Sequence, residues 1–164
     1  MLKLPLFPLN LVLLPYENLP LHIFEPRYRT MMEEVLAGLP LAIFSIQEGQ
    51  EALGDLARPA NAGTLVQLDT VERMADGRMN LLVTGTARVR WEEAVSDDPF
   101  LKARLQLWED EDTKPDQTEH GVLAAQIYQE LTDYLALLQI QAKVELPREP
   151  HLICHLAIQN SGLP

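Results

Sequence analysis

The residues from Met79 to Trp91 alternate between two kinds of side chain. The odd-numbered positions are apolar or glycine, and the even-numbered positions are polar, with Leu82 as the one exception. A period of two over this length predicts a long strand with one buried face. Gly85 falls in the middle of that face, where a glycine typically marks a bend or bulge in a curling sheet. We therefore expect the strand to belong to a barrel.

Three further segments are predicted to be strands. Residues 64–74 are strand-like and are followed by Asp76-Gly77, a pair typical of hairpin turns. Residues 101–108 alternate in the same way as the long strand. Residues 41–46 are apolar on both faces, which indicates a strand in the middle of a sheet.

One helix is expected among these strands, and two more are expected after them. Pro26 suits a first helical turn, apolar residues recur at helical spacing as far as Leu36, and Gly38 is a typical helix end. A longer helix with an apolar face is predicted for residues 119–141. A third is predicted to start near Pro150 and to end at Asn160.

The pattern therefore divides the chain into a β-rich domain, residues 1–110, and a C-terminal helical extension, residues 118–164. The acidic segment between them contains Pro115 and is predicted to be an exposed connection. The expected fold class is α+β: a pseudo-β-barrel with one embedded helix, followed by the helical extension. A chain of 164 residues with 47% apolar residues is large enough to bury a core without disulfides or metals.

Composition limits the partners and the compartment. The net charge of −11 disfavours nucleic acid and anionic membranes, because affinity for phosphates requires basic residues. No stretch approaches the roughly 18 apolar residues that a membrane-spanning helix requires. The single cysteine, Cys154, cannot form a disulfide within the chain. A cytoplasmic location is the default expectation, and the sequence leaves the oligomeric state open.

The sequence contains no recognisable catalytic motif. It has neither a glycine-rich phosphate loop nor a nucleophile elbow. His151, Cys154 and His155 have a spacing that a metal site on a helix could use, but the apolar residues between them favour packing. We therefore expect no catalytic residues, no metal and no cofactor.

The first thirty residues are unusual in a different way. Four prolines stand in strongly apolar sequence between Pro5 and Pro20, which favours edge strands and rigid crossings over a central ladder. Residues 19–24 then predict a short strand that runs directly into the helix starting at Pro26. Glu25 stands just before that helix, where a carboxylate interacts favourably with the helix dipole.

This opening resembles the N-terminal substrate-binding domain of Lon ATP-dependent proteases. The resemblance rests on the following matches: Pro5–Leu9, Leu11–Pro15, Leu19–Met31 with its segment IFEPRYR, Gly63-Thr64, Asp76-Gly77, and the stretch VTGTARVRW from Val83 to Trp91. The IFEPRYR segment is the most specific of these. The matches cover about Leu2 to Leu107, and the predicted long helix fits the helical extension of the family.

The resemblance implies a PUA-like pseudo-barrel, which agrees with the strand pattern, and a role in capturing unfolded polypeptide or a protein partner. The ATPase and Ser-Lys protease modules of Lon have no counterpart in this sequence, so the resemblance implies recognition without catalysis. Peptide capture by a barrel uses an exposed apolar groove or a sheet edge. The candidate site residues are Leu21, Phe24 and Tyr28 for apolar contacts and Glu25, Arg27 and Arg88 for polar specificity. Packing of Phe24 and Tyr28, and an ion pair for Arg27, are the structural alternatives.

RNA binding is the alternative function, because PUA-like folds often bind RNA. Four basic residues on outward-facing strand positions, Arg88, Arg90, Lys102 and Arg104, are the candidate RNA-binding face.

Overall fold

The computed structural model describes residues 3–49, 57–96, 98–108, 117–137 and 150–160. The chain forms two compact units, Met1–Glu109 and Asp110–Pro164. The described elements of the first unit are β1 (Lys3–Leu9), β2 (Asn18–Ile23), α1 (Pro26–Leu36), β3 (Leu41–Glu48), β4 (Arg58–Arg73), β5 (Met79–Ser96) and β6 (Lys102–Leu107). Those of the second unit are α2 (Gln117–Leu137) and α3 (Pro150–Asn160).

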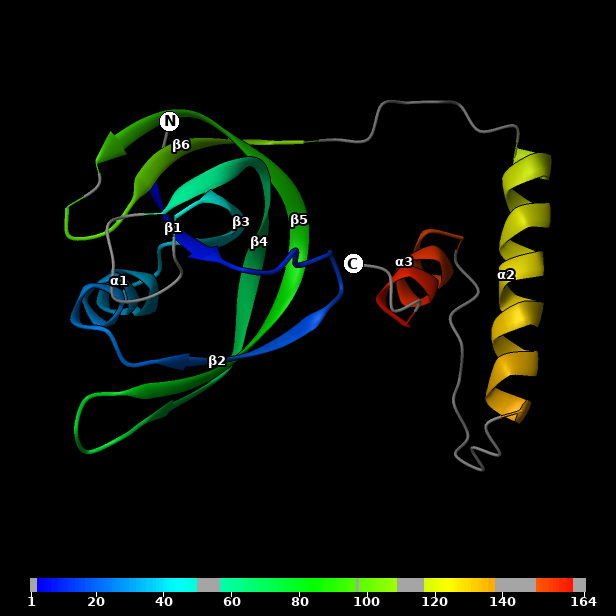
Figure 1. Ribbon diagram of the computed structural model, residues 1–164, viewed down its shortest axis with the longest axis horizontal. Helices are drawn as coiled ribbons and strands as arrows, with labels where there is room; N and C mark the ends of the chain where they lie inside the picture. Colours follow the sequence, from blue (N-terminus) through cyan, green and yellow to red (C-terminus); the bar gives the residue numbers. More distant parts are fainter. Residues whose placement is uncertain (1–2, 50–56, 97, 109–116, 138–149, 161–164) are drawn as a thin grey trace. The chain divides into compact units, whose positions relative to one another are not determined.

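The strands of the first unit form one sheet that closes on itself. Their order is β2-β5-β4-β3-β1-β6, and β6 also pairs with β5. Five strands therefore form a ring, and β2 lies outside it as an edge strand on β5 (Figure 1). Register shifts between β3 and β4, β4 and β5, and β5 and β6 give these strands the curvature that closure requires. The predicted α+β pseudo-barrel is confirmed, although the ring is uneven.

Gly85 lies where the long strand β5 is crossed by the turn before β2. The Gly85 N–H donates to the Glu17 carbonyl at 2.9 Å, and the Tyr16 N–H donates to the Gly85 carbonyl at 2.8 Å. A Cβ at Gly85 would overlap the carbonyl oxygen of Leu14. The predicted irregularity is present beside it, because Leu65 pairs with Ala87 while the next residue of β4 pairs with Gly85. Glycine is needed here because another stretch of backbone lies directly on the strand.

The hairpin turn expected between β4 and β5 is present at Asp76-Gly77. Gly77 has a φ of +85°, which favours glycine. The Asp76 carboxylate accepts the Arg78 N–H at 3.1 Å and the Arg78 Nε–H at 2.7 Å. These hydrogen bonds, the backbone one first, lower the pKa of Asp76 below its usual value of 3.8.

The prolines of the opening segment predict edge strands, and this is correct for β2 but wrong for β1. Pro20 lies in β2, at the edge of the sheet, whereas β1 lies between β3 and β6. Strand β1 tolerates Pro5 and Pro8 because its two pairings are staggered. Residues 3–5 pair with β6, and residues 6–9 pair with β3. Most of its residues therefore pair on one side only, so a missing N–H need not interrupt a ladder.

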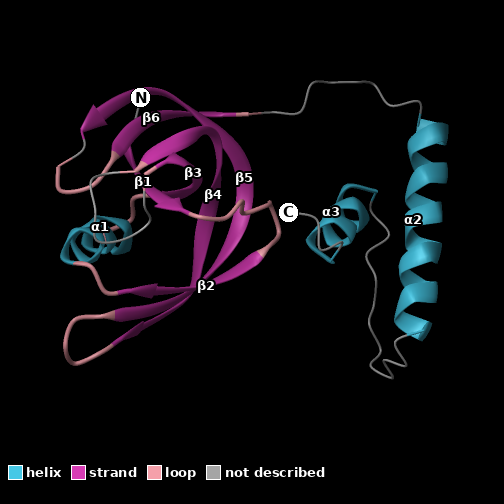
Figure 2. Cartoon of the chain, in the orientation of Figure 1, coloured by secondary structure: helices cyan, strands magenta, loops and turns pink. Residues whose placement is uncertain are grey.

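Helix α1 packs its apolar face into the main core of the first unit (Figure 2). Tyr28, Met31, Met32 and Val35 are buried, and both methionines are fully inaccessible. The predicted helix is confirmed from Pro26 onward. It stops before Gly38, which has a φ of +112°. Burial of these four side chains fixes α1 on the sheet and thereby fixes the direction in which the preceding residues leave β2.

The second unit contains the two predicted C-terminal helices. Helix α2 ends at Leu137 within the described residues, so positions 138–141 of the prediction lie outside them. Leu123 and Tyr134, expected on the apolar face of this helix, are both 52% exposed, whereas Ala124 is buried. In α3, Ile153 is buried as the helical spacing predicts. No helix in the described part of the chain is both long and apolar enough to cross a membrane.

Candidate functional site

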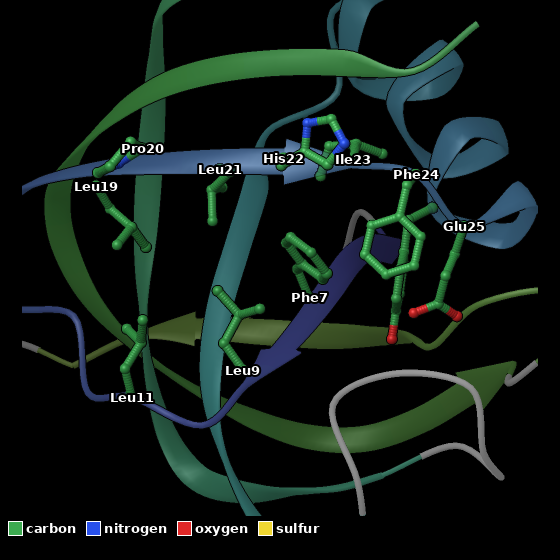
Figure 3. A pocket seen from close by; sticks show the side chains of 11 residues that line it. Phe7, Leu9, Leu11, Leu19, Pro20, Leu21, His22, Ile23, Phe24 and Glu25 are labelled. Atoms are coloured by element: carbon green, nitrogen blue, oxygen red, sulfur yellow. The ribbon is translucent and has the colours of Figure 1, made fainter. Parts of the chain in front are cut away.

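An apolar groove of about 270 Å³ lies between β1 and β2. We call it the β1–β2 groove. It is lined by Phe7, Leu9, Leu11, Leu19, Pro20, Leu21, His22, Ile23, Phe24, Glu25 and Tyr28. In Figure 3, Leu19 and Leu21 extend from β2 toward Leu9 and Leu11 on the opposite side, with Phe24 and Glu25 at one end. Four of the six candidate site residues, Leu21, Phe24, Glu25 and Tyr28, are thus brought together.

Strand β2 supplies one wall of the groove because its side chains alternate. Leu19 and Leu21 are half-buried against the main core, while Pro20 and His22 are exposed on the opposite face. The outer face is held by side-chain hydrogen bonds to β5. His22 Nδ1 lies 2.7 Å from Asn80 Oδ1, and on the same face the Thr84 hydroxyl oxygen lies 2.6 Å from the side-chain amide of Asn18. This pairing keeps the leucines directed into the groove.

Phe24 continues this alternation in exposure one residue beyond the end of β2, before the start of α1. It is 45% exposed, and both of its neighbours, Ile23 and Glu25, are buried. Its ring stacks loosely on His22, with 6.1 Å between the ring centroids. The packing alternative considered for Phe24 therefore does not account for its position. A large aromatic side chain left exposed at the end of an apolar groove is a typical binding feature.

Tyr28, Glu25 and Arg27 form the end of the groove near α1. Tyr28 is buried and packs on Phe7, with ring centroids 4.6 Å apart, so its packing role is confirmed. Glu25 is the N-cap residue of α1 but makes no side-chain capping hydrogen bond. Its Oε2 lies 2.9 Å from Arg27 Nε, and the Arg27 guanidinium lies 4.7 Å from the centroid of the Tyr28 ring. The carboxylate thus pairs with Arg27, which is the ion pair considered for that residue.

Arg88 is not part of this site. It lines a separate hollow of about 100 Å³ formed with Val12–Pro15 and residues 62–64. Its guanidinium lies 5.9 Å from the Trp108 ring centroid. The strand pattern correctly predicted that Arg88 is exposed. The strand pattern could not show where along the curved strand β5 the groove lies. Leu81 and Val83 lie beside the groove, whereas Arg88 lies farther along the strand.

The four basic residues considered for RNA are engaged within the chain. Lys102 pairs with Glu34 at 2.6 Å and Arg104 pairs with Glu93 at 3.2 Å. Arg90 donates two hydrogen bonds to the side chain of Gln106, at 3.0 and 2.7 Å. Lys102 is also only half-exposed. Phosphate binding would have to compete with these contacts, so they weaken the argument for an RNA-binding face.

The candidate metal ligands are only partly described. Cys154 is half-buried, and the side chains of His151 and His155 lie outside the described residues. Among the side chains that are described, no group of three or more His, Cys, Asp or Glu residues is arranged to hold a metal ion.

Sequence reasoning missed part of the groove. Phe7, Leu9 and Leu11 form the wall opposite β2, and Leu19 continues the wall on β2 itself. Leu19 could have been predicted as a lining residue, because it precedes Leu21 by two residues and therefore lies on the same face of the strand. The contribution of residues 7–11 depends on where β1 lies in the sheet, and no local pattern shows that.

The fold is thus a small α+β pseudo-barrel with an apolar groove beside an edge strand. The family model of the ATP-dependent protease La (LON) substrate-binding domain matches residues 3–164. The chain belongs to this family.

Curated relatives agree with the family. A Lon protease from Desulfosudis oleivorans is 29% identical over 134 residues, which cover 77% of this chain and 16% of that protein. Lon protease 2 from Syntrophobacter fumaroxidans is 31% identical over 119 residues, which cover 70% of this chain and 15% of that protein. The chain therefore matches about a sixth of the length of these relatives.

Solved structures show the same fold. The Lon N-terminal domain protein from Xanthomonas campestris has a TM-score of 0.63 and 24% identity, with the whole of both chains covered. The N-terminal domain of the Mycobacterium avium complex Lon protease has a TM-score of 0.68 and 16% identity, covering 99% of this chain and 84% of that one. At these identities the likeness concerns the fold alone.

Proposed function

We propose that this domain captures apolar segments of unfolded polypeptide in the β1–β2 groove, and that it acts by binding without catalysis. The observation that carries the proposal is the exposed Phe24 ring beside the half-buried Leu19 and Leu21. Exposed apolar surface of this kind costs free energy in water and is retained where a partner covers it. An unfolded chain offers side chains of matching chemistry.

The shape and charge of the groove favour a polypeptide over a small molecule or RNA. Its volume of about 270 Å³ is at the lower end of the range of roughly 300–1,000 Å³ that is usual for small-ligand pockets, and the groove lies along a strand. Its acidic lining residue, Glu25, is already paired with Arg27. Apolar contact is therefore the main interaction that the groove offers.

The proposal assigns different roles to the six candidate residues. Leu21 and Phe24 contact the bound segment. Tyr28 and the Glu25–Arg27 pair shape the end of the groove, and Arg88 has no part in it. The family description and the relatives named Lon protease support a role in selecting polypeptides for proteolysis, and we place that role in the cytoplasm.

The test is the substitution Phe24→Ser, with Leu107→Ser as the matched control because Leu107 is 56% exposed on β6. Binding of fluorescently labelled β-casein, an unstructured protein, is followed by anisotropy. Loss of an aromatic anchor typically costs 1–2 kcal/mol or more, so we expect binding to weaken about tenfold in Phe24→Ser and to stay unchanged in the control. Unchanged affinity in a folded Phe24→Ser variant would exclude the groove. Salt-dependent binding of a labelled single-stranded RNA would instead support the alternative function.

A further inference from the structure

Strand β2 has one edge without a partner strand. It pairs with β5 through residues 18–23 and has no second partner among the described residues. The β1–β2 groove runs along this strand (Figure 3). A strand edge beside an apolar groove offers both hydrogen-bonding groups and side-chain contacts to an extended chain.

One hydrogen bond shows which residues of β2 direct their backbone groups to β5 and which direct them to the open edge. The Gly85 N–H donates to the Glu17 carbonyl, and Asn18 pairs with Thr84 in an antiparallel ladder without register shifts. Hydrogen-bonded and non-hydrogen-bonded pairs alternate in such a ladder, so residues 19, 21 and 23 bond to β5. The backbone groups of residues 18, 20 and 22 therefore point to the open edge. Pro20 is tolerated in β2 because its missing N–H lies on that edge.

The outer face of the sheet beside this edge is polar. Asn18 and His22 of β2 contact Thr84 and Asn80 of β5 there. The exposed carboxylates of Asp69 and Glu72 contact the same two β5 side chains but lie on β4, two strands in from the edge. A strand added beside β2 would present alternate side chains to this polar face and to the apolar groove.

We infer that the captured polypeptide adds to β2 as an antiparallel strand, with apolar side chains in the groove and polar side chains on the outer face beside Asn18 and His22. This inference rests on the proposed function and specifies the ligand class: extended segments in which apolar and polar residues alternate. Antiparallel pairing uses both backbone groups of one residue, which suits the edge-facing groups of Asn18 and His22. Pro20 offers only its carbonyl, so one hydrogen bond is missing at the centre of the edge, which limits promiscuous strand pairing.

The probe is a capped, fluorescein-labelled seven-residue peptide of alternating valine and lysine that begins and ends with valine, titrated against the full chain. In an antiparallel strand with valines in the groove and lysines on the outer face, the lysine amides point to β2 and the valine amides point to solvent. We expect N-methylation of the three lysine amides to weaken binding at least tenfold. N-methylation of the valine amides should leave binding unchanged.

The matched protein variants are Pro20→Val and Pro40→Val, both at exposed prolines. Pro20→Val restores an edge N–H and should tighten binding about two- to tenfold, whereas Pro40→Val should have no effect. If the N-methylated lysine peptide and Pro20→Val both bind like the originals while Phe24→Ser still fails to bind, strand addition is wrong and side-chain capture remains. If Phe24→Ser also binds normally, the proposed function fails as well. Weaker binding of only the valine-methylated peptide would indicate a parallel strand and would overturn the inference.

Discussion

Substitution of Gly85 by alanine tests the physical reason given for the curvature of β5. The new Cβ would overlap the Leu14 carbonyl oxygen and lie 3.1 Å from Thr64 Cγ2, so the crossing turn must move. Movement breaks or lengthens the two backbone hydrogen bonds between Gly85 and residues 16 and 17, which contribute about 0.5–1.5 kcal/mol each. Displacement of packed backbone adds about 1–3 kcal/mol. We expect the free energy of unfolding to fall by about 2–6 kcal/mol, the sum of these contributions.

Urea unfolding followed by tryptophan fluorescence measures this loss, because both tryptophans, Trp91 and Trp108, lie in the first unit. The midpoint should fall by more than about 1 M. Thr86→Ala is the matched control. It removes only the hydrogen bond from an exposed hydroxyl to the Leu65 carbonyl, so its cost should stay below about 1 kcal/mol. A Gly85→Ala variant that is as stable as Thr86→Ala would refute the close-approach argument.

Two further predictions concern charged residues. Glu25→Ala removes the carboxylate that pairs with the largely buried Arg27, so thermal unfolding should show that the free energy of unfolding falls by about 1–3 kcal/mol. Glu34→Ala, at the more exposed pair with Lys102, should lower it by less than about 1 kcal/mol. Equal losses in the two variants would contradict the assigned burial. The lowered pKa of Asp76 means that its stabilisation is present above pH 3.8 and is lost as the pH falls through the folded-state value. Asp76→Asn should therefore unfold more easily than the original chain near pH 6, and the difference should disappear in strong acid. A constant difference across that range would show that charge is not its cause.

Much of the fold could be predicted because its signals are local. The alternation around β5, the apolar run of β3 and the helical spacing from Pro26 each indicated the correct element. The prediction that β1 is an edge strand was wrong. A proline disrupts a sheet only where its missing N–H would face a paired neighbour, and the sequence does not show which side of β1 is paired. Pro5 and Pro8 are tolerated by a staggered arrangement of two neighbours that are distant in sequence.

The candidate site was predictable only in part. The residues from Leu21 to Tyr28 were found because they follow one another in sequence and carry the family resemblance. Arg88 was misplaced because the side of a strand on which a residue lies can be predicted locally, whereas its position around a ring cannot. Phe7, Leu9 and Leu11 were missed because they face β2 only after β1 is inserted into the sheet.

The sequence by itself determined the elements, their buried faces and the family, because periodicity and turn residues act over a few positions. Only the tertiary structure decided that β2 remains an edge strand, that Phe24 is exposed beside a groove, and that Glu25 pairs with Arg27 instead of capping α1. These outcomes depend on the closure of the ring between β5 and β6, which brings together segments separated by many residues. Closure is a property of the whole sheet, and it leaves one strand and its hydrogen-bonding groups available for a partner.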